Sequence, residues 1–253
     1  AQDDRRLAAV NELWRAAGLT PIERADRDRP LSLDNLVASG AGDGETAAEP
    51  RVTVIVPVHN AEATLATALA GLAAQHWTAL EVLVLDDAST DGSRAVAAAF
   101  AEADPRFRVL VQETNQGTYA ARNRGLREAS GDLITVHDSD DWSHPDKLAA
   151  QVHGLLAHPE WAGCFSHWVR CTPDLWFGKW RVDDGWIYRN TSSLMVRRSV
   201  FDTLGYWDRV RVEADTEYAL RIRAAFGEQA LGDVHPGVPL ALGRHTPDSL
   251  SQA

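Results

Sequence analysis

Three carboxylates crowd the segment 136–142, which reads VHDSDDW. It follows an apolar run, 133–136, that is typical of a buried strand, and it precedes a proline-containing helix start. The charges of Asp138, Asp140 and Asp141 repel one another at this spacing, and that costs stability unless a cation offsets it. Carboxylate oxygens suit a hard divalent ion such as Mg²⁺ or Mn²⁺. The alternative is an acidic turn that caps the next helix.

Composition narrows the classes of protein that this chain can represent. Its 253 residues suit one large α/β domain or two small ones. A formal net charge of -11 argues against binding to nucleic acid or to an anionic membrane surface. Cys164 and Cys171 lack the spacing of metal ligands, and we expect them to be reduced and structural. No apolar run approaches the about 20 residues of a membrane span, and no signal peptide is recognisable.

The first fifty residues differ in character from the rest. Apolar residues spaced through 3–17 predict one amphipathic helix, and 18–37 is a mixed stretch with two prolines. The segment 38–50 is small, Gly-rich and acidic, as a linker would be. We therefore expect residues 1–50 to be an appendage. It either docks on the main domain or offers its helix to a partner, and the sequence leaves both open.

From residue 51 the chain alternates between strand and helix patterns. Strands are predicted at 52–57, 80–85, 107–111 and 133–136, with helices at 61–75, 91–103 and 118–128 between them. This alternation predicts right-handed crossovers and a mostly parallel sheet. Ligands bind beyond the carboxyl ends of such strands. The polar groups that follow three of the strands, 57–60, 86–87 and 138–140, should therefore meet at one edge.

The second half shows shorter and more mixed elements. Helices are predicted at 145–157, 198–204 and 212–226, and strand-like runs at 163–169, 190–196, 229–234 and 238–242. The pattern indicates a smaller, mixed half that follows a nucleotide-binding type of half.

Four stretches, taken in order, resemble one known family. They are 54–60, 85–93, 115–123 and 138–142, and the similarity covers roughly residues 51–251. Together they resemble the family 2 glycosyltransferases, inverting enzymes with the GT-A fold. The resemblance implies one α/β domain over 51–253, with a Rossmann-like nucleotide-sugar-binding half (51–142) and a mixed half for the acceptor and the catalytic base (143–253). It also implies an NDP-sugar donor, often a UDP-sugar, and Mn²⁺ or Mg²⁺.

The resemblance also assigns residues to the donor. Its donor-binding positions are Pro57, His59, Asn60, Asp86, Asp87, Arg122, Asp138 and Ser139. The first three would line the base and ribose, and one of the two acids at 86–87 would accept a hydrogen bond from the base. Asp138 would face the ribose or the donor sugar. The alternatives are helix capping for the acids at 86–87 and a surface arginine at position 122.

The metal and the base follow from the same resemblance. Asp138-Ser139-Asp140 matches the DxD motif, in which Asp140 would bind the metal that bridges the two donor phosphates. His245 would complete the metal shell, unless it is an ordinary loop histidine. Inverting transfer needs a carboxylate that takes the acceptor proton. Asp215 matches the family's catalytic Asp, although the adjoining Glu position holds Ala214. Two neighbouring acids, Glu213 and Glu217, are alternative bases.

Aromatic side chains suggest an acceptor groove. Trp168, Trp176, Trp180 and Trp186 lie in one stretch, and indole faces can stack on sugar rings. We assign Trp168, Trp186 and Ser192 to acceptor binding, with core packing as the alternative for each tryptophan.

These observations predict a metal-dependent inverting glycosyltransferase that acts on a saccharide or glycoconjugate hydroxyl, in cell-surface polysaccharide synthesis by analogy. Its expected location is the cytoplasm, peripherally at the inner face of the membrane. One alternative is a degenerate binding or scaffold module, which the alanine at position 214 favours. Another is a nucleotidyltransferase, but that class should carry a Gly-rich basic loop after the first strand, and 57–62 does not.

Overall fold

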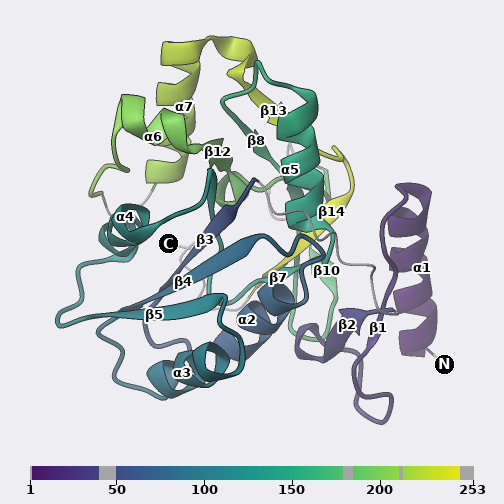
Figure 1. The fold of residues 1–253 in the computed structure, drawn as a ribbon. Helices are drawn as coiled ribbons and strands as arrows, with labels where there is room; N and C mark the ends of the chain where they lie inside the picture. Colours follow the sequence, from purple (N-terminus) through teal and green to yellow (C-terminus); the bar gives the residue numbers. More distant parts are fainter. Residues whose placement is uncertain (1, 40–49, 179–184, 211–212, 246–253) are drawn as a thin grey trace.

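A seven-stranded sheet forms the centre of the fold, with helices on both of its faces (Figure 1). The computed structural model describes residues 2–39, 50–178, 185–210 and 213–245. The central strand order is β13-β8-β12-β6-β3-β4-β5. These strands are β3 (Val52–Val58), β4 (Leu80–Asp87), β5 (Phe107–Gln112), β6 (Leu133–Val136), β8 (Gly163–Phe165), β12 (Met195–Arg197) and β13 (Leu231–Asp233).

Most pairings in the central sheet are parallel. Strand β3 pairs in parallel with β4 and β6, β4 with β5, and β13 with β8, whereas β12 is antiparallel to both of its neighbours. Strands β3 and β4 are buried along their whole length, which fits their continuous apolar runs. The predicted α/β class with a mostly parallel sheet is confirmed.

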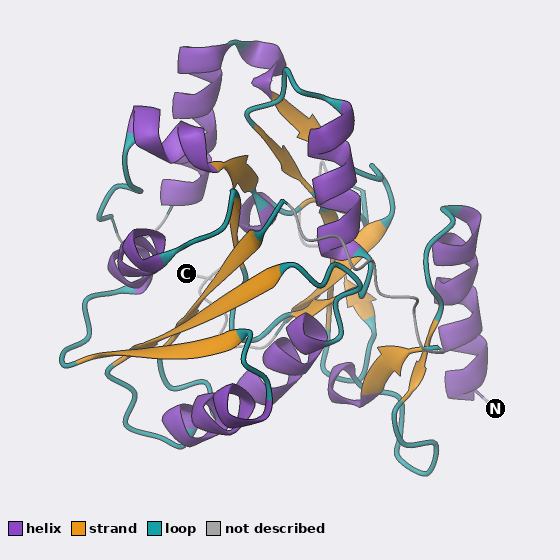
Figure 2. Cartoon of the chain, in the orientation of Figure 1, coloured by secondary structure: helices purple, strands orange, loops and turns teal. Residues whose placement is uncertain are grey.

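The helices divide between the two faces of this sheet (Figure 2). Helices α2 (Leu65–Ala73), α3 (Ser93–Ala103) and α5 (Lys147–Ala157) pack on one face, and α4 (Thr118–Glu128), α6 (Arg198–Leu204) and α7 (Ala214–Phe226) pack on the other. Successive strand side chains point to opposite faces, so Val54 and Val56 join the first group while Ile55 joins the second. Two hydrophobic layers therefore enclose the sheet.

A second, mixed sheet lies beside the first. It contains β7 (Trp142–Ser143), β9 (His167–Cys171), β10 (Phe177–Gly178), β11 (Tyr188–Arg189) and β14 (Pro239–Arg244). Its order is β10-β9-β14-β7, with β11 also on β9. The last strand, β14, is parallel to β9 and antiparallel to β7. Strand β7 follows directly on the acidic segment, so that segment is anchored between the two sheets.

Several element boundaries differ from the predictions. Helix α2 begins at Leu65 rather than at residue 61, and α5 begins at Lys147 rather than at 145. The run 190–196 becomes a strand only from residue 195, where β12 (Met195–Arg197) begins after the 3₁₀ turn η2 (Thr191–Ser193). Another 3₁₀ turn, η3 (Glu228–Ala230), precedes β13. Most of the predicted linker 38–50, the start of the predicted helix 212–226 and Trp180 fall outside the described residues.

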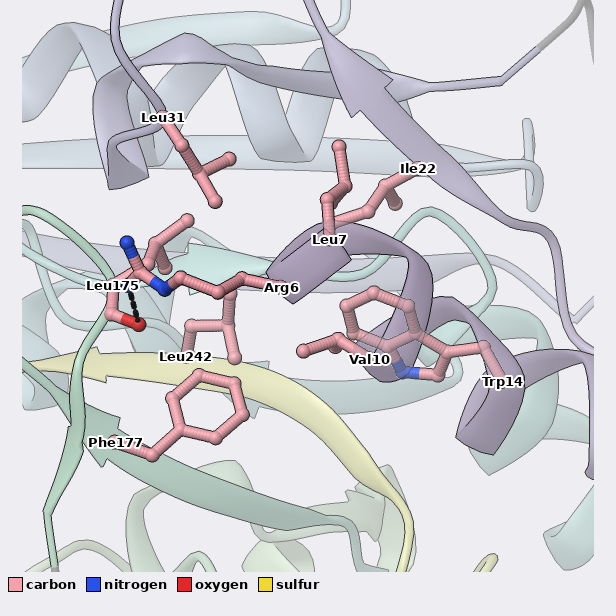
Figure 3. Close-up of a pocket in the computed structure, with 9 residues that line it drawn as sticks. All are labelled: Arg6, Leu7, Val10, Trp14, Ile22, Leu31, Leu175, Phe177 and Leu242. Carbon is pink, nitrogen blue, oxygen red and sulfur yellow. Dashed lines mark hydrogen bonds between the residues drawn. The ribbon is translucent and has the colours of Figure 1, made fainter. Parts of the chain in front are cut away.

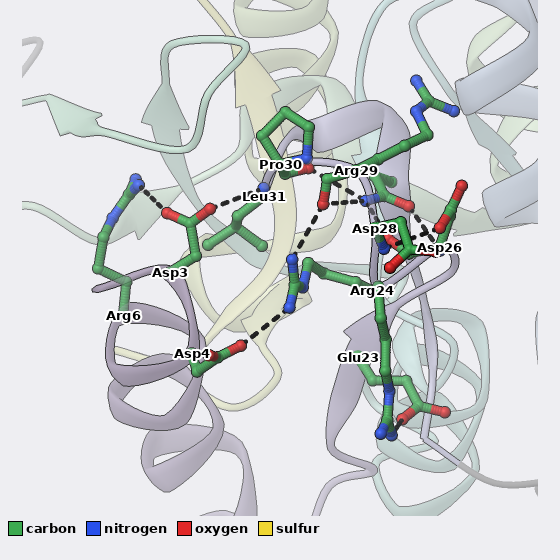
Figure 4. Close-up of polar contacts among 12 residues, drawn as sticks. Asp3, Asp4, Arg6, Glu23, Arg24, Asp26, Asp28, Arg29, Pro30 and Leu31 are labelled. Carbon is green, nitrogen blue, oxygen red and sulfur yellow. Dashed lines mark hydrogen bonds and ion pairs between the residues drawn. The ribbon is translucent and has the colours of Figure 1, made fainter. Parts of the chain in front are cut away.

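The first described stretch of the chain, residues 2–39, is called here the N-terminal segment. It forms α1 (Gln2–Ala16), β1 (Ile22–Arg24), the 3₁₀ turn η1 (Leu33–Asn35) and β2 (Leu36–Ala38). The short antiparallel pair of β1 and β2 was not predicted, because the stretch 18–37 has no clear period. Polar contacts tie this pair to α1, including the ion pair between Arg24 and Asp4 (Figure 4).

The N-terminal segment packs on the mixed sheet. Trp14 is fully buried, and its indole Nε1 donates a hydrogen bond of 2.7 Å to the carbonyl of Pro239 in β14. Trp14 and Leu242 also line a small apolar pocket between α1 and β14 (Figure 3). Arg6, at the rim of this pocket, donates to the carbonyls of Asp174 and Leu175 at 2.8 and 2.6 Å. The segment is therefore part of one of the hydrophobic cores.

Replacing Trp14 with alanine should lower the free energy of unfolding by about 3–5 kcal/mol, because it opens a cavity and leaves the Pro239 carbonyl without its donor. Urea unfolding would measure the change. Leu13→Ala is the matched control, since Leu13 is adjacent on α1 but 43% exposed, and it should cost no more than about 0.5 kcal/mol. Equal costs for the two variants would contradict the packing described here.

Cys164 and Cys171 are both free and buried, which is the setting expected of structural cysteines. Their reduced state stays a prediction. Across the ranges that the structure describes, no helix combines the length and the apolar character needed to cross a bilayer.

Candidate active site

The polar ends of three central strands lie side by side. Strands β6, β3 and β4 are neighbours and run in parallel, so the residues that follow Val136, Val58 and Asp87 share one edge of the sheet. The predicted convergence of the groups 57–60, 86–87 and 138–140 is thereby confirmed.

A buried arginine connects two of the predicted site carboxylates. Arg122 lies in α4 with 3% of its side chain exposed. Its Nη1 donates to Oδ1 of Asp215 at 2.6 Å, and its Nη2 donates to Oδ1 of Asp138 at 3.0 Å. The alternative of a surface arginine at position 122 is wrong. Residues that are far apart in the sequence therefore form one charged cluster.

Asp215 lies in the first turn of α7, where the helix dipole favours a negative charge. Burial raises the pKa of its carboxyl above the ordinary value, although the charge and hydrogen bond of Arg122 oppose the rise. The hydroxyl of Tyr119 lies 3.5 Å from Asp215 Oδ2, and the ring of Tyr119 faces the Arg122 guanidinium at 5.1 Å. The carboxylate is thus held in one orientation by a cation that is itself buried.

The alternative bases have different surroundings. Glu213 is exposed at the N-cap of α7, in the left-handed region with φ of 70°. Glu217 accepts a 2.5 Å hydrogen bond from Arg221 within the same helix. The Arg122 guanidinium is bonded to Asp215 and Asp138, which sets Asp215 apart from these two glutamates.

The acidic loop after β6 carries more negative charge than its surroundings neutralise. Burial, together with the charge of Asp138, raises the pKa of Asp140 to about 6. Burial and the charges of Asp140 and Asp138 raise the pKa of Asp141 well above its usual value. Asp141 does not cap α5, because the N-cap of that helix is Asp146. Oδ1 of Asp141 accepts instead from the backbone N–H of Arg244 at 3.0 Å. The helix-cap alternative for this loop is therefore wrong.

Behind the loop lies a buried polar chain. His137 Nε2 is 2.7 Å from the Ser143 hydroxyl, which also accepts from Lys147 Nζ at 3.2 Å. Burial lowers the pKa of His137 to about 3, so this ring is neutral at pH 7. Burial also lowers the pKa of Lys147 to about 8, and the nearby Asp141 opposes that shift. His137 also reaches the acidic loop directly, since its Nδ1 lies 2.7 Å from the Asp138 carbonyl.

The acidic loop offers few side-chain ligands for a divalent cation. In the described portion of the chain, no group of three or more His, Cys, Asp or Glu side chains is arranged to hold a metal. Mg²⁺, however, is commonly held by one or two carboxylates together with substrate phosphates. Asp140 and Asp138 supply two such carboxylates, and a cation would offset both the burial of Asp140 and the charge of Asp138 beside it, which together raise the pKa of Asp140. The residues therefore fit a metal that binds jointly with a diphosphate.

His245 is the last described residue of the chain. It follows β14 directly, and its backbone N–H donates to the Cys171 carbonyl at 2.8 Å. It does not belong to a three-ligand group among the described residues. Its role as a metal ligand stays a prediction.

The predicted nucleoside contacts separate into exposed and buried groups. His59 and Asn60 are exposed after β3, with His59 Nδ1 2.8 Å from the carbonyl of Asp87, whereas Pro57 is buried inside the strand. Asp86 is buried and accepts from Arg94 at 2.8 Å. The acids at 86–87 do not cap α3, whose N-cap is Gly92, so that alternative is wrong.

Asp87 holds the loop that leads into α4. Its Oδ1 accepts from Gln112 at 2.5 Å and from the backbone N–H of Gln116 at 2.8 Å. Its Oδ2 accepts from the backbone N–H of Gly117 at 2.7 Å, where φ of 87° suits glycine. A hydrogen bond from Asp87 to a nucleobase stays a prediction, and the structure adds a second role in shaping this loop.

The predicted acceptor residues lie on or near the mixed sheet. Trp168 is half-buried in β9, with an edge contact to Tyr188 at 5.9 Å and the Arg170 guanidinium 5.0 Å above its ring. Trp186 is 57% exposed. Ser192 lies in η2, where its N–H donates to Asn190. Ser139, in the DxD segment, accepts from the Thr64 hydroxyl through its carbonyl. Their contacts with a substrate stay predictions.

A family profile matches this arrangement of strands and acids. The profile described as "Glycosyl transferase family 2" covers residues 53–207, more than half of the chain. The chain belongs to glycosyl transferase family 2. The resemblance of the four sequence stretches to this family is thereby confirmed.

Two curated relatives share part of this family 2 chain. An uncharacterised glycosyltransferase of Haemophilus influenzae is 37% identical over 121 residues, 46% of this chain and 48% of its own length. The succinoglycan biosynthesis protein ExoO of Rhizobium meliloti is 39% identical over 103 residues, 41% of this chain and 29% of its own. The chain thus spans less than half the length of either relative.

Two solved structures share the fold. TarS of Staphylococcus aureus, in complex with UDP-GlcNAc, aligns with a TM-score of 0.64 at 18% identity, over 80% of this chain and 61% of that one. The mannosyltransferase PcManGT of Pyrobaculum calidifontis, in complex with GDP-Man and Mn²⁺, aligns with a TM-score of 0.60 at 23% identity, over 78% and 57%. At these identities the similarity establishes the GT-A fold.

One residue near the acidic loop was not predicted. Arg244, the last residue of β14, donates from Nε to the Asp140 carbonyl at 3.0 Å. The family profile ends at residue 207, so Arg244 and Asp215 both lie beyond the matched part of this family 2 chain. No local pattern marks Arg244, because its contacts depend on β14 pairing with β7.

Proposed function

We propose that this chain is a metal-dependent inverting glycosyltransferase that moves a sugar from an NDP-sugar to a hydroxyl of a saccharide or glycoconjugate. The observation that carries the proposal is the bridge from Asp215 through Arg122 to Asp138. It sets one carboxylate on α7 opposite the strand-end acids, with a buried cation between them. An inverting transfer needs this division, because the base and the leaving diphosphate act on opposite faces of the sugar.

In the proposed reaction the acceptor oxygen attacks the anomeric carbon as the bond to the diphosphate breaks. Asp215 takes the proton of the acceptor hydroxyl, and the electron pair of the broken bond leaves with the nucleoside diphosphate. Arg122 keeps the Asp215 carboxylate oriented, and its positive charge favours the ionised form that can accept a proton. Tyr119 limits the rotation of the same carboxylate.

The proposed metal site consists of Asp140 with Asp138 beside it. A divalent cation bound there with the donor would neutralise the charge that develops on the departing diphosphate. Asp140 contributes a carboxylate whose pKa is raised to about 6, first by burial and then by the neighbouring charge of Asp138. His59 and Asn60 are exposed near the neighbouring strand end, where they can reach a base and ribose.

The donor and the pathway are proposed by analogy. A UDP-sugar is the first choice, since TarS is solved with UDP-GlcNAc, while GDP-Man in PcManGT keeps a second nucleotide in view. The name of ExoO supports a role in making a cell-surface polysaccharide. We place the enzyme in the cytoplasm, peripherally at the inner face of the membrane. We retain 51–253 as the catalytic domain, with its two halves divided at residue 142.

A binding module is the second candidate, and Ala214 favours it. Ala214 is the first residue of α7 and is fully buried in the core, at the position that the family's Glu would occupy. Asp215, Asp138 and Asp140 remain in place, which supports catalysis over binding alone. Family membership leaves the nucleotidyltransferase alternative without support.

A donor panel with Mn²⁺ tests the proposal. UDP-, GDP- and dTDP-sugars would be incubated with the full chain and saccharide acceptors, with and without EDTA, and the release of nucleoside diphosphate measured. We expect turnover of at least one donor that EDTA abolishes and added Mn²⁺ restores. Metal-dependent binding of UDP without turnover of any donor would instead favour the binding module.

A further inference from the structure

Arg244 forms hydrogen bonds to two residues of the acidic loop. Its Nε donates to the Asp140 carbonyl at 3.0 Å, and its own N–H donates to Asp141 Oδ1, also at 3.0 Å. The side chain is 7% exposed, so the guanidinium is nearly removed from water. A buried cation of this kind needs an anionic partner.

The partner comes from the N-terminal segment. Asp34, in η1, forms an ion pair with Nη2 of Arg244, and Nη1 lies 3.3 Å from its other oxygen. The Thr67 hydroxyl of α2 donates to Asp34 at 2.5 Å. Burial opposes the ionisation of Asp34, but the bond from Arg244 prevails and lowers its pKa. The two residues are 210 positions apart, so this pair joins the ends of the chain.

The same segment also holds the residues that follow the loop. The ring of Trp14 lies 4.9 Å from that of His144, and His144 Nε2 is 2.8 Å from the Thr20 carbonyl. The N–H of Thr20 donates to Asp146 Oδ2 at 2.7 Å. The N-terminal segment therefore holds two neighbours of the acidic loop: Arg244, which bonds to the loop, and the stretch 144–146, which follows it in sequence.

We propose that Asp34 is a positioning residue for the metal-binding loop, acting through Arg244 on the backbone and carboxylates of Asp140 and Asp141. The N-terminal segment then serves the site of its own chain. This inference rests on the proposed metal-dependent function, because it concerns the binding of the cation at Asp140.

The physical reason is competition for the loop carboxylates. With Asp34 in place, both Nη groups of Arg244 are engaged with it, and Nε donates to the carbonyl of Asp140. Without the charge of Asp34, the guanidinium would be free to pair with a carboxylate of the acidic loop, where its charge already acts on Asp140. An arginine paired with these groups would oppose a divalent cation, so metal binding should weaken although no metal ligand has changed.

The test measures Mn²⁺ binding to the full chain in the presence of UDP, by electron paramagnetic resonance of free Mn²⁺. Asp34→Asn should raise the half-saturating Mn²⁺ concentration about tenfold. Asp34→Glu, which keeps the charge, should stay within about threefold of wild type. Asp4→Asn is the matched control, because it removes an ion pair of the same segment, with Arg24, without touching the loop, and it should leave Mn²⁺ binding unchanged.

A double-mutant comparison tests the route through Arg244. Asp34→Asn should have little effect on Mn²⁺ binding in an Arg244→Gln background, because no guanidinium is then left to pair with the loop carboxylates. Additive effects, or equal Mn²⁺ binding by Asp34→Asn and Asp4→Asn, would overturn the inference while leaving the proposed function intact. Wild-type protein that binds no Mn²⁺ with UDP would overturn both. Should Asp34→Asn fail to fold, Thr67→Val should weaken Mn²⁺ binding in the same direction, and no change would overturn the inference.

Discussion

Asp215→Asn should retain donor binding and lose transfer by about 10²–10⁴-fold, the range that a positioned general base contributes. The amide keeps the shape of the carboxylate, and its oxygen can still accept a hydrogen bond from Arg122 Nη1, which lies 2.6 Å from Oδ1 of Asp215 in the wild-type protein. It cannot take the acceptor proton. UDP binding should change little, because Arg122 keeps Asp138 as an anionic partner. Steady-state release of nucleoside diphosphate and calorimetric binding of UDP with Mn²⁺ would separate the two effects.

Glu217→Gln is the matched control for this experiment. Glu217 lies on the same helix and was an alternative base, but its carboxylate is bound to Arg221. We expect turnover within about threefold of wild type, since the pair is half-exposed and contributes little. Near-native turnover by Asp215→Asn, or a large loss in Glu217→Gln, would show that the base has been misassigned.

Asp140→Ala should weaken Mn²⁺-dependent UDP binding by on the order of 100-fold or more, because it removes one of the two carboxylates that fit the cation. The free energy of unfolding without metal should stay the same or rise at pH 7. The pKa of Asp140 in the folded protein is raised to about 6, above its ordinary value, so its ionised form is disfavoured by folding at neutral pH. Removing the group removes that cost, and the advantage should disappear as the pH falls below about 4.

Asp132→Ala is the control, because Asp132 precedes β6 at the opposite end of the same strand and accepts from the backbone N–H of Arg51. It should leave Mn²⁺ and UDP binding unchanged. Calorimetry and urea unfolding on both variants would give the comparison. Unaltered binding by Asp140→Ala would contradict the metal assignment, whatever the effect on stability.

The central sheet could be predicted because its information is local. The runs at 52–57 and 80–85 are continuously apolar, and each is followed by a helix of clear period, so their parallel pairing follows from general rules of connection. Because neighbouring parallel strands end on the same side, Val58, Asp87 and Val136 must lie at one edge of the sheet. Local patterning was enough to indicate which carboxylates gather there.

Contacts between distant segments could not be predicted. The sequence offers many acidic residues that could pair with Arg122. Only the folded arrangement of α4, α7 and the loop after β6 brings Asp215 and Asp138 to it. The pair of Asp34 with Arg244 is set by the docking of the N-terminal segment. Strand β1, with the sequence IER, is too short and too charged for a period to appear.

The position of β14 has a consequence for how the protein is made. This strand is the last described element of the chain, yet it lies between β9 and β7 and supplies the carbonyl that accepts from Trp14, 225 residues earlier. At about 5–20 residues per second, a ribosome needs roughly 11–45 s to travel that distance. During this interval the indole of Trp14 lacks its partner and the nascent acidic loop lacks its support. We therefore expect the half around β3 and β4 to become protease-resistant first, and the N-terminal helix to follow only after the strand has left the exit tunnel.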